Sequence, residues 1–283
     1  MSVRNFDAYT QFLMDVHSEH PGLTERSIGL AQTADGLSSY EAFCAFVDPQ
    51  PGMTVVDLAC GNGPLCEVLS ERVGESGQVI GVDLCDAELK LAAECLRRYS
   101  NVRLLMDSAD KVSLPGDSTD IVVCHMAFML FTPLKPVVDE IARILKCGGA
   151  FAAVVPTLRR PTDLFRECAG VLHSALVGEK HRLDAISCNA VKMSCVPDLQ
   201  QIFVGDGWVQ EDIVLFDIDV SVTAKPEALA DLVTPAFYHY HLLSAEARCR
   251  VRLHWTDLFK LKCDESGITR FHYPLSAFLI RKR

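Results

Sequence analysis

The stretch VVDLACGNG, residues 55–63, places an acidic residue beside closely spaced small residues at the end of an apolar segment. Glycines at such a turn let a loop approach a bound nucleotide, but the third glycine of the dinucleotide-binding pattern Gly-x-Gly-x-x-Gly is missing. Asp57 would repel a pyrophosphate and attract a sulfonium or an ammonium group. We therefore expect Asp57, Ala59, Gly61 and Gly63 to bind a cationic cofactor, with Ala59 at a negative φ that tolerates its methyl group.

Two further polar groups follow the next apolar segments. Asp83 ends VIGVD, 20 residues after Gly63, and can accept hydrogen bonds from both hydroxyls of a ribose, with Leu84 beside it. In NVRLLMDSA, the Asp107 carboxylate and the backbone N–H of Ser108 can pair with the amino edge of an adenine. The order of these groups indicates a site for an adenosine that carries a cationic tail.

Histidines are the candidates for proton transfer. His125 ends the segment IVVCH and is the first candidate for a general base; the alternative is that it only borders the cofactor. His241, in FYHYH, is the second candidate for a residue that faces a substrate. His17 and His20 would share one face of a helix, but no third ligand is evident, so we expect no metal site.

Apolar segments alternate with helical patterns between residues 49 and 156, which is typical of βαβ units in a parallel sheet. Pro64 favours the beginning of a helix, and Gly148-Gly149 favours the end of one. The expected strands are Met53–Leu58, Val79–Leu84, Val102–Met106, Asp120–His125 and Ala150–Val155, and the expected helices are Pro64–Val73, Ala87–Tyr99 and Pro136–Lys146.

The remaining segments are mostly helical in pattern, with two further strands expected at Ile213–Val222 and Phe271–Ile280. We expect an α/β, doubly wound, Rossmann-like fold with a helical cap that is formed by the N-terminus and by insertions. The predicted parts are an N-terminal helical lid at 1–48, a cofactor-binding domain at 49–156 and 203–283, and a helical cap at 157–202 to which 225–262 contributes.

Composition excludes several classes of function. The chain of 283 residues has a formal net charge of −10 and a pI near 5.4, which disfavours binding to nucleic acid. No apolar run is long enough to span a membrane, and no secretory signal pattern occurs at the N-terminus. The 12 cysteines form no Cys-x-x-Cys pair, which favours a reducing, cytoplasmic location.

The four signals VVDLACGNG, VIGVD, Asp107-Ser108 and LKCGGAF, in this order, resemble the class I S-adenosylmethionine-dependent methyltransferases over roughly residues 50–155. The resemblance implies S-adenosylmethionine as cofactor and a seven-stranded sheet whose last strand is antiparallel. It also assigns Asp83 to the ribose, Asp107 and Ser108 to the adenine, and the region of His125 to the boundary between cofactor and substrate. Ala59 departs from the family's first motif, which has a glycine there.

The sequence after the fourth expected strand, Cys124-His125-Met126-Ala127, lacks the motifs of the family's exocyclic-amine and cytosine-C5 methylating branches. What remains resembles the small-molecule group, which includes ubiquinone/menaquinone-type and natural-product methyltransferases. We expect methyl transfer to oxygen or nitrogen, or alternatively carbon, of a small acceptor that is apolar or aromatic. Two alternatives stay open: an enzyme of the same fold with another reaction type, and a non-catalytic scaffold. The oligomeric state is not predicted.

Overall fold

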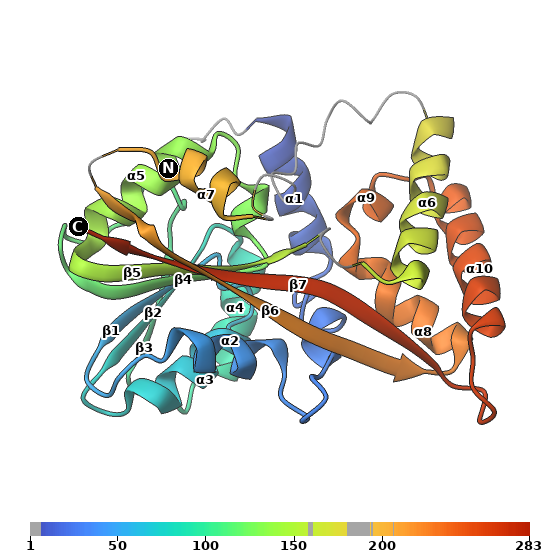
Figure 1. Ribbon diagram of the computed structural model, residues 1–283, viewed down its shortest axis with the longest axis horizontal. Coiled ribbons are helices and arrows are strands. Elements are labelled where there is room, and N and C mark those ends of the chain that lie inside the picture. Colours follow the sequence, from blue (N-terminus) through green and yellow to red (C-terminus); the bar gives the residue numbers. More distant parts are fainter. Residues whose placement is uncertain (1–6, 158–160, 180–192, 194, 206) are drawn as a thin grey trace.

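In the described part of the chain, seven strands form one mixed sheet, which confirms the expected fold class. The computed structural model describes residues 7–157, 161–179, 193, 195–205 and 207–283. The strand order is β3-β2-β1-β4-β5-β7-β6; β1 to β5 are parallel, and β7 is antiparallel to both neighbours (Figure 1). The strands are β1 Thr54–Leu58, β2 Gln78–Asp83, β3 Val102–Met106, β4 Thr119–His125, β5 Leu145–Pro156, β6 Trp208–Ala224 and β7 Thr269–Lys282.

Helices flank the sheet and extend beyond it. Apolar residues of β1, β4 and β5 are almost completely buried between the helical layers, as expected for central parallel strands. The helices of the described residues are α1 Ala8–Glu19, η1 Ile28–Leu30, α2 Ser39–Val47, α3 Pro64–Val73, α4 Asp86–Cys95, η2 Phe128–Leu130, α5 Leu134–Ile144, α6 Asp163–Gly178, α7 Val196–Ile202, α8 Pro226–Val233, η5 Thr234–Ala236, α9 Tyr238–His241 and α10 Ala245–Leu261.

Two helices end earlier than the sequence predicted: α4 ends at Cys95 instead of Tyr99, and α5 ends at Ile144 instead of Lys146. The helix expected to end at Gly148-Gly149 ends at Ile144, and both glycines lie inside β5. There the pairing of β4 with β5 shifts register between Thr119 and Ile121, and Gly148 has a φ of +77°. These glycines therefore lie at an irregularity in the strand pairing and do not cap the helix.

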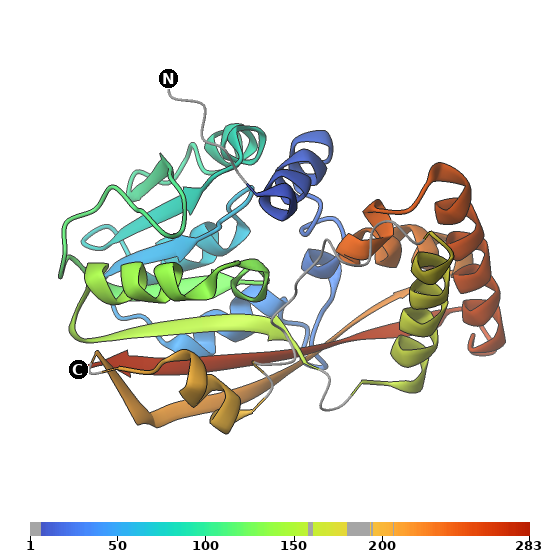
Figure 2. The ribbon, with the colours of Figure 1, turned by 90° about the horizontal axis from the view of Figure 1, so that it is seen from above.

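β6 and β7 are longer than expected, and a helical unit formed by α6, α8 and α10 lies at their far end. They extend to 17 and 14 residues and pair along most of their length. Figures 1 and 2 show α6 and α10 side by side beyond the parallel strands, and both α6 and α8 contact α10. Within this unit, Trp255 Nε1 donates to the carbonyl of Cys168 at 3.1 Å. The long pair of strands thus positions the helical unit relative to the parallel part of the sheet.

The N-terminal helices occupy two different places. α1 contacts α4, whereas α2 contacts α3 and β6. The helix α7 contacts β6, and α6 contacts α10, so the segment 157–202 also divides between two places. Residues 158–160, 180–192 and 194 of the expected cap lie outside the described residues. The division of the chain into a lid, a cofactor-binding domain and a cap stays a prediction.

Candidate active site

The loop between β1 and α3 turns in the left-handed region. Ala59, Gly61 and Gly63 have φ values of +59°, +54° and +86°. The expectation of a negative φ at Ala59 is therefore wrong, because the tight turn imposes a conformation in which Cβ crowds its own backbone. Gly63 has the most positive φ of the three, and a Cβ there would also lie 2.5 Å from Leu96 Cδ1, which would have to move.

A cavity of about 660 Å³ opens where β1, β2 and β4 end. The carboxyl ends of parallel strands are the usual place for ligands in such sheets. Gly63 and His241 are not among the side chains that form its wall. The wall includes eight of the residues predicted from the sequence: Asp57, Ala59, Gly61, Asp83, Leu84, Asp107, Ser108 and His125.

Asp57 is a buried carboxyl at the floor of this cavity, and only 1% of its surface is exposed. Burial, opposed by a hydrogen bond from the Cys66 thiol at 3.3 Å and reinforced by the charge of Asp83, raises the pKa of Asp57 to about 7. None of these groups supplies a positive charge. A cationic ligand would therefore stabilise the ionised carboxylate, which fits the sulfonium and ammonium groups of S-adenosylmethionine.

Asp83 joins the end of β2 to the glycine loop. Its Oδ2 accepts from the Gly61 backbone N–H, and its Oδ1 accepts from the Cys85 N–H, both at 2.8 Å. Burial raises the pKa of Asp83, and these two backbone hydrogen bonds oppose the rise. Each carboxylate oxygen has a second lone pair, so the two oxygens can still accept from ribose hydroxyls. The arrangement fits the ribose-binding role that was predicted.

Asp107 and Ser108 lie on the same cavity, beyond the end of β3. The Asp107 carboxylate accepts from the Ser113 backbone N–H at 2.7 Å, and the Ser108 carbonyl accepts from the Lys111 N–H at 2.9 Å. These two contacts close a short turn that fixes the direction of both residues. Their position beside the end of β3 fits a contact with the adenine, which stays a prediction.

His125 points toward the N-terminal helix α2. Its Nε2 lies 3.1 Å from Ser39 Oγ, and its ring lies 4.4 Å from the Tyr40 ring, centroid to centroid. Burial lowers the pKa of His125 to about 3, so the ring is neutral at physiological pH. Met126, the next residue, has a φ of +60°, a strained value at the wall of the cavity. The geometry favours a positioning role for His125 over that of a general base.

The other histidines highlighted by the sequence contact protein groups. His241 Nε2 lies 3.3 Å from the Pro235 carbonyl, and its ring contacts that of His20. His17 instead contacts Glu88 and Tyr238. Among the described residues, no cluster of three or more His, Cys, Asp or Glu side chains is arranged to hold a metal ion.

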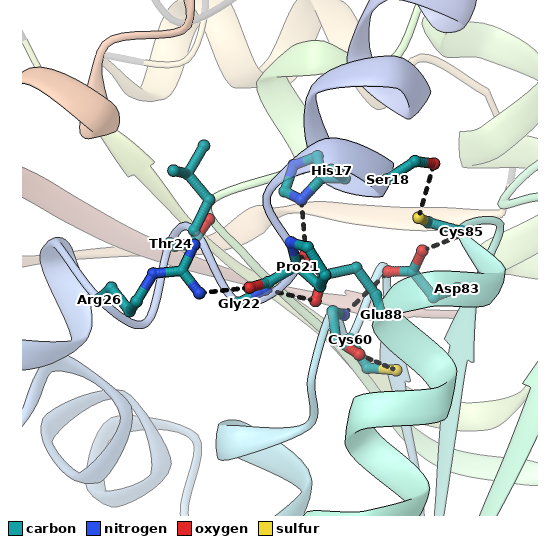
Figure 3. A network of polar contacts seen from close by, with 12 residues as sticks. His17, Ser18, Pro21, Gly22, Thr24, Arg26, Cys60, Asp83, Cys85 and Glu88 are labelled. Carbon is teal, nitrogen blue, oxygen red and sulfur yellow. Dashed lines mark hydrogen bonds and ion pairs between the residues drawn. The ribbon is translucent and has the colours of Figure 1, made fainter.

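A network around Glu88 was not predicted from the sequence. Glu88 is 2% exposed, and its carboxylate accepts from His17 Nδ1 at 2.7 Å and from the Gly22 N–H at 2.9 and 3.1 Å (Figure 3). His17 Nε2 lies 2.9 Å from Tyr238 Oη. A carboxylate in the first turn of a helix gave no distinguishing signal, because acidic residues are favoured there in any case.

The comparisons with known proteins agree with this geometry. Residues 55–149 match the family described as methyltransferase domain. Nocamycin O-methyltransferase of Saccharothrix syringae is 32% identical over 148 residues, which cover 51% of this chain and 50% of that protein. The ubiquinone/menaquinone biosynthesis C-methyltransferase of Shewanella pealeana is 35% identical over 103 residues, or 35% of this chain and 41% of that protein.

A solved structure extends the likeness of the fold to nearly the whole chain. Phosphoethanolamine N-methyltransferase 2 of Haemonchus contortus, in complex with S-adenosyl-L-methionine, superposes with a TM-score of 0.60 at 15% identity and covers 98% of this chain and 60% of that one. The chain spans about half the length of the curated relatives that it matches. Over residues 55–149 the chain is therefore similar to the S-adenosylmethionine-dependent methyltransferases, and the sheet order and the acidic groups around the glycine loop agree with that similarity.

Proposed function

We propose that this protein transfers a methyl group from S-adenosylmethionine to a small-molecule acceptor. The observation that carries the proposal is the meeting of Asp57, Asp83 and Asp107 at one cavity, with the glycine loop between them. Asp57 would pair with the cationic end of the cofactor, Asp83 with the ribose and Asp107 with the adenine. When bound, S-adenosylmethionine supplies an activated methyl group on its sulfonium.

The chain's own residues would position the acceptor and exclude water. In-line displacement requires the acceptor atom to be close to the methyl group and aligned with the bond that breaks. The cavity wall beyond Asp57 includes Leu13 and Met14 of α1, together with Leu130 and Phe131 after β4. These apolar side chains favour an apolar or aromatic acceptor and keep water from the site.

His125 would act by holding Ser39 and Tyr40 of α2 against the end of β4. Its low pKa and its contact with Ser39 make it a poor acceptor of protons at neutral pH. The names of the similar proteins specify oxygen, carbon and nitrogen, and the proposal of oxygen or nitrogen, or alternatively carbon, follows from the sequence. The expected cytoplasmic location is part of the same proposal. No helix of the described residues is long and apolar enough to cross a bilayer.

Titration calorimetry with S-adenosylmethionine and with S-adenosylhomocysteine tests cofactor use. Incubation with panels of phenols, enols and amines, followed by detection of S-adenosylhomocysteine, then tests methyl transfer. If the protein binds S-adenosylmethionine and converts a substrate without forming S-adenosylhomocysteine, the cofactor is a bystander in the reaction. If neither S-adenosylmethionine nor S-adenosylhomocysteine binds, methyl transfer and a reaction with a bystander cofactor are both excluded, and the non-catalytic scaffold remains.

A further inference from the structure

Glu88, His17 and Tyr238 form a relay of three side chains on the cavity wall, from α4, α1 and α9. The distances are 2.7 Å from Glu88 Oε1 to His17 Nδ1 and 2.9 Å from His17 Nε2 to Tyr238 Oη. All three residues line the same cavity as Asp57 and Asp83. The arrangement, in which a carboxylate contacts an imidazole and the imidazole contacts a hydroxyl, resembles the one that orients catalytic hydroxyls in other enzymes.

The relay fixes which group carries the proton. Two donors face the Glu88 carboxyl: His17 Nδ1 lies 2.7 Å from Oε1, and the Gly22 N–H is shared between both oxygens at 2.9 and 3.1 Å. His17 Nδ1 and Glu88 Oε1 form an ion pair when the ring is protonated, and Glu88 is buried, so the pair favours the imidazolium form of His17. Both ring nitrogens of an imidazolium are donors, so with His17 in this form its Nε2–H donates to Tyr238 Oη. The hydroxyl hydrogen of Tyr238 is then available to a ligand.

Tyr238 shares its cavity with two groups of the expected cationic end. Tyr40, Asp57 and Tyr238 all line this cavity. Tyr40 also stacks at a tilt on His125. An acceptor that approaches the cationic end of the cofactor from this side would meet the Tyr238 hydroxyl.

We propose that Tyr238, held by the Glu88–His17 ion pair, binds the acceptor by donating its hydroxyl hydrogen to an acceptor oxygen, and that the acceptor is a phenol or an enol bound as its anion. The inference rests on the proposed methyltransferase function and names the acceptor class for the same site. A donor backed by an imidazolium favours an anionic oxygen over a neutral one. The aromatic rings of Tyr40 and Phe131 on the cavity wall suit a planar, conjugated acceptor.

The reaction then needs no base in the protein. The phenol or enol leaves its proton in water on binding, and an electron pair of its oxygen forms the new O–C bond. The electron pair of the broken S–C bond stays on sulfur, so the cationic sulfonium becomes a neutral sulfide. Tyr238 keeps its own proton throughout, and Glu88 and His17 remain an ion pair that positions it.

Two tyrosine variants separate this role from a structural one. Tyr238→Phe removes the hydroxyl and keeps the ring, whose centroid lies 5.7 Å from that of His17. Tyr240→Phe is the matched control, since Tyr240 lies on the same short helix, donates to the Arg248 carbonyl at 3.3 Å and does not line the cavity. Thermal unfolding of both variants checks that each remains folded.

The probe is 4-nitrophenol, whose phenolate absorbs visible light, titrated into the full chain saturated with sinefungin, an unreactive cationic analogue of the cofactor. At a pH where the free probe is mostly protonated, the wild-type complex should increase the phenolate absorbance. Tyr238→Phe should weaken probe binding about tenfold, as expected for one charge-assisted hydrogen bond. Its affinity for sinefungin, measured by calorimetry, should stay within about twofold, because Tyr238 is assigned to the acceptor.

Three outcomes would overturn the assignment of Tyr238: no phenolate signal with the wild-type complex, an equal loss of probe binding in Tyr240→Phe, or unchanged probe binding in Tyr238→Phe. Failure of the wild-type chain to bind sinefungin is a separate result, which would overturn the proposed function together with this inference. His17→Gln provides a further readout, since it should reduce the phenolate signal while a positively charged His17→Arg should retain more of it.

Discussion

Ser39 Oγ lies 3.1 Å from His125 Nε2, so a helix from the N-terminal segment contacts the residue that ends β4. The contact joins two segments that are 86 residues apart in the sequence. It also occupies the nitrogen that would otherwise be a candidate for proton transfer. Protonation of His125 would disturb this contact, so the free energy of unfolding should depend on the protonation of His125.

His125→Gln should remove a pH dependence of stability. The pKa of His125 is about 3 in the folded chain and near 6.5 when unfolded, so the unfolded chain binds more protons between these values. Wild-type stability is then full above about pH 6.5 and falls as the pH decreases toward about 3. Gln keeps an amide near Ser39 but does not titrate, so urea unfolding between these pH values should show a flatter dependence. His254→Gln, a change at an exposed position of α10, should keep the wild-type slope.

Asp83→Asn should weaken the binding of S-adenosylmethionine by about 1–3 kcal/mol, because it removes charge-assisted hydrogen bonds to the ribose. It also weakens the acceptor for the Gly61 and Cys85 backbone N–H groups, so the glycine loop becomes less well held. Calorimetry of the folded variant measures the change. Unchanged affinity would mean that the adenosine lies elsewhere in the cavity.

Ala59→Gly should stabilise the protein by about 1 kcal/mol, because glycine adopts the observed φ of +59° without the crowding of Cβ. The same substitution at Ala93, an exposed position in α4, should have the opposite sign and cost about 1 kcal/mol of helix stability. Urea unfolding of both variants measures the change in the free energy of unfolding. Destabilisation by both changes would show that the turn at residue 59 is not strained.

The sequence was sufficient for the part of the site that depends on strand ends. Asp57, Asp83 and Asp107 each follow a short apolar segment, and parallel pairing brings such ends to one edge of the sheet. The φ of Ala59 was not predictable, because a left-handed turn at alanine has no local signature. The relay of His17 with Tyr238 joins residues 221 apart, and only the packing of α1 and α9 around the cavity brings them together.

Binding of S-adenosylmethionine should release a proton from Asp57 below pH 7. Burial, with the Cys66 thiol opposing and the charge of Asp83 adding to it, holds the pKa of this carboxyl at about 7 in the free protein. A bound cation favours the carboxylate and lowers that pKa, so the release should approach about one proton at pH 6 and become small at pH 8. Affinity should accordingly rise with pH up to about 7 and then level off.

Calorimetry in buffers with different enthalpies of ionisation measures the number of protons released. Asp57→Asn should bind the cofactor more weakly and show an enthalpy that no longer depends on the buffer, because the amide does not titrate. Asp107→Asn is the matched control: Asp107 lines the same cavity but is assigned to the adenine, so the proton release should persist. Proton uptake by the wild-type chain, or a release that persists in Asp57→Asn, would assign the linkage to a different group and remove Asp57 from the cationic end of the site.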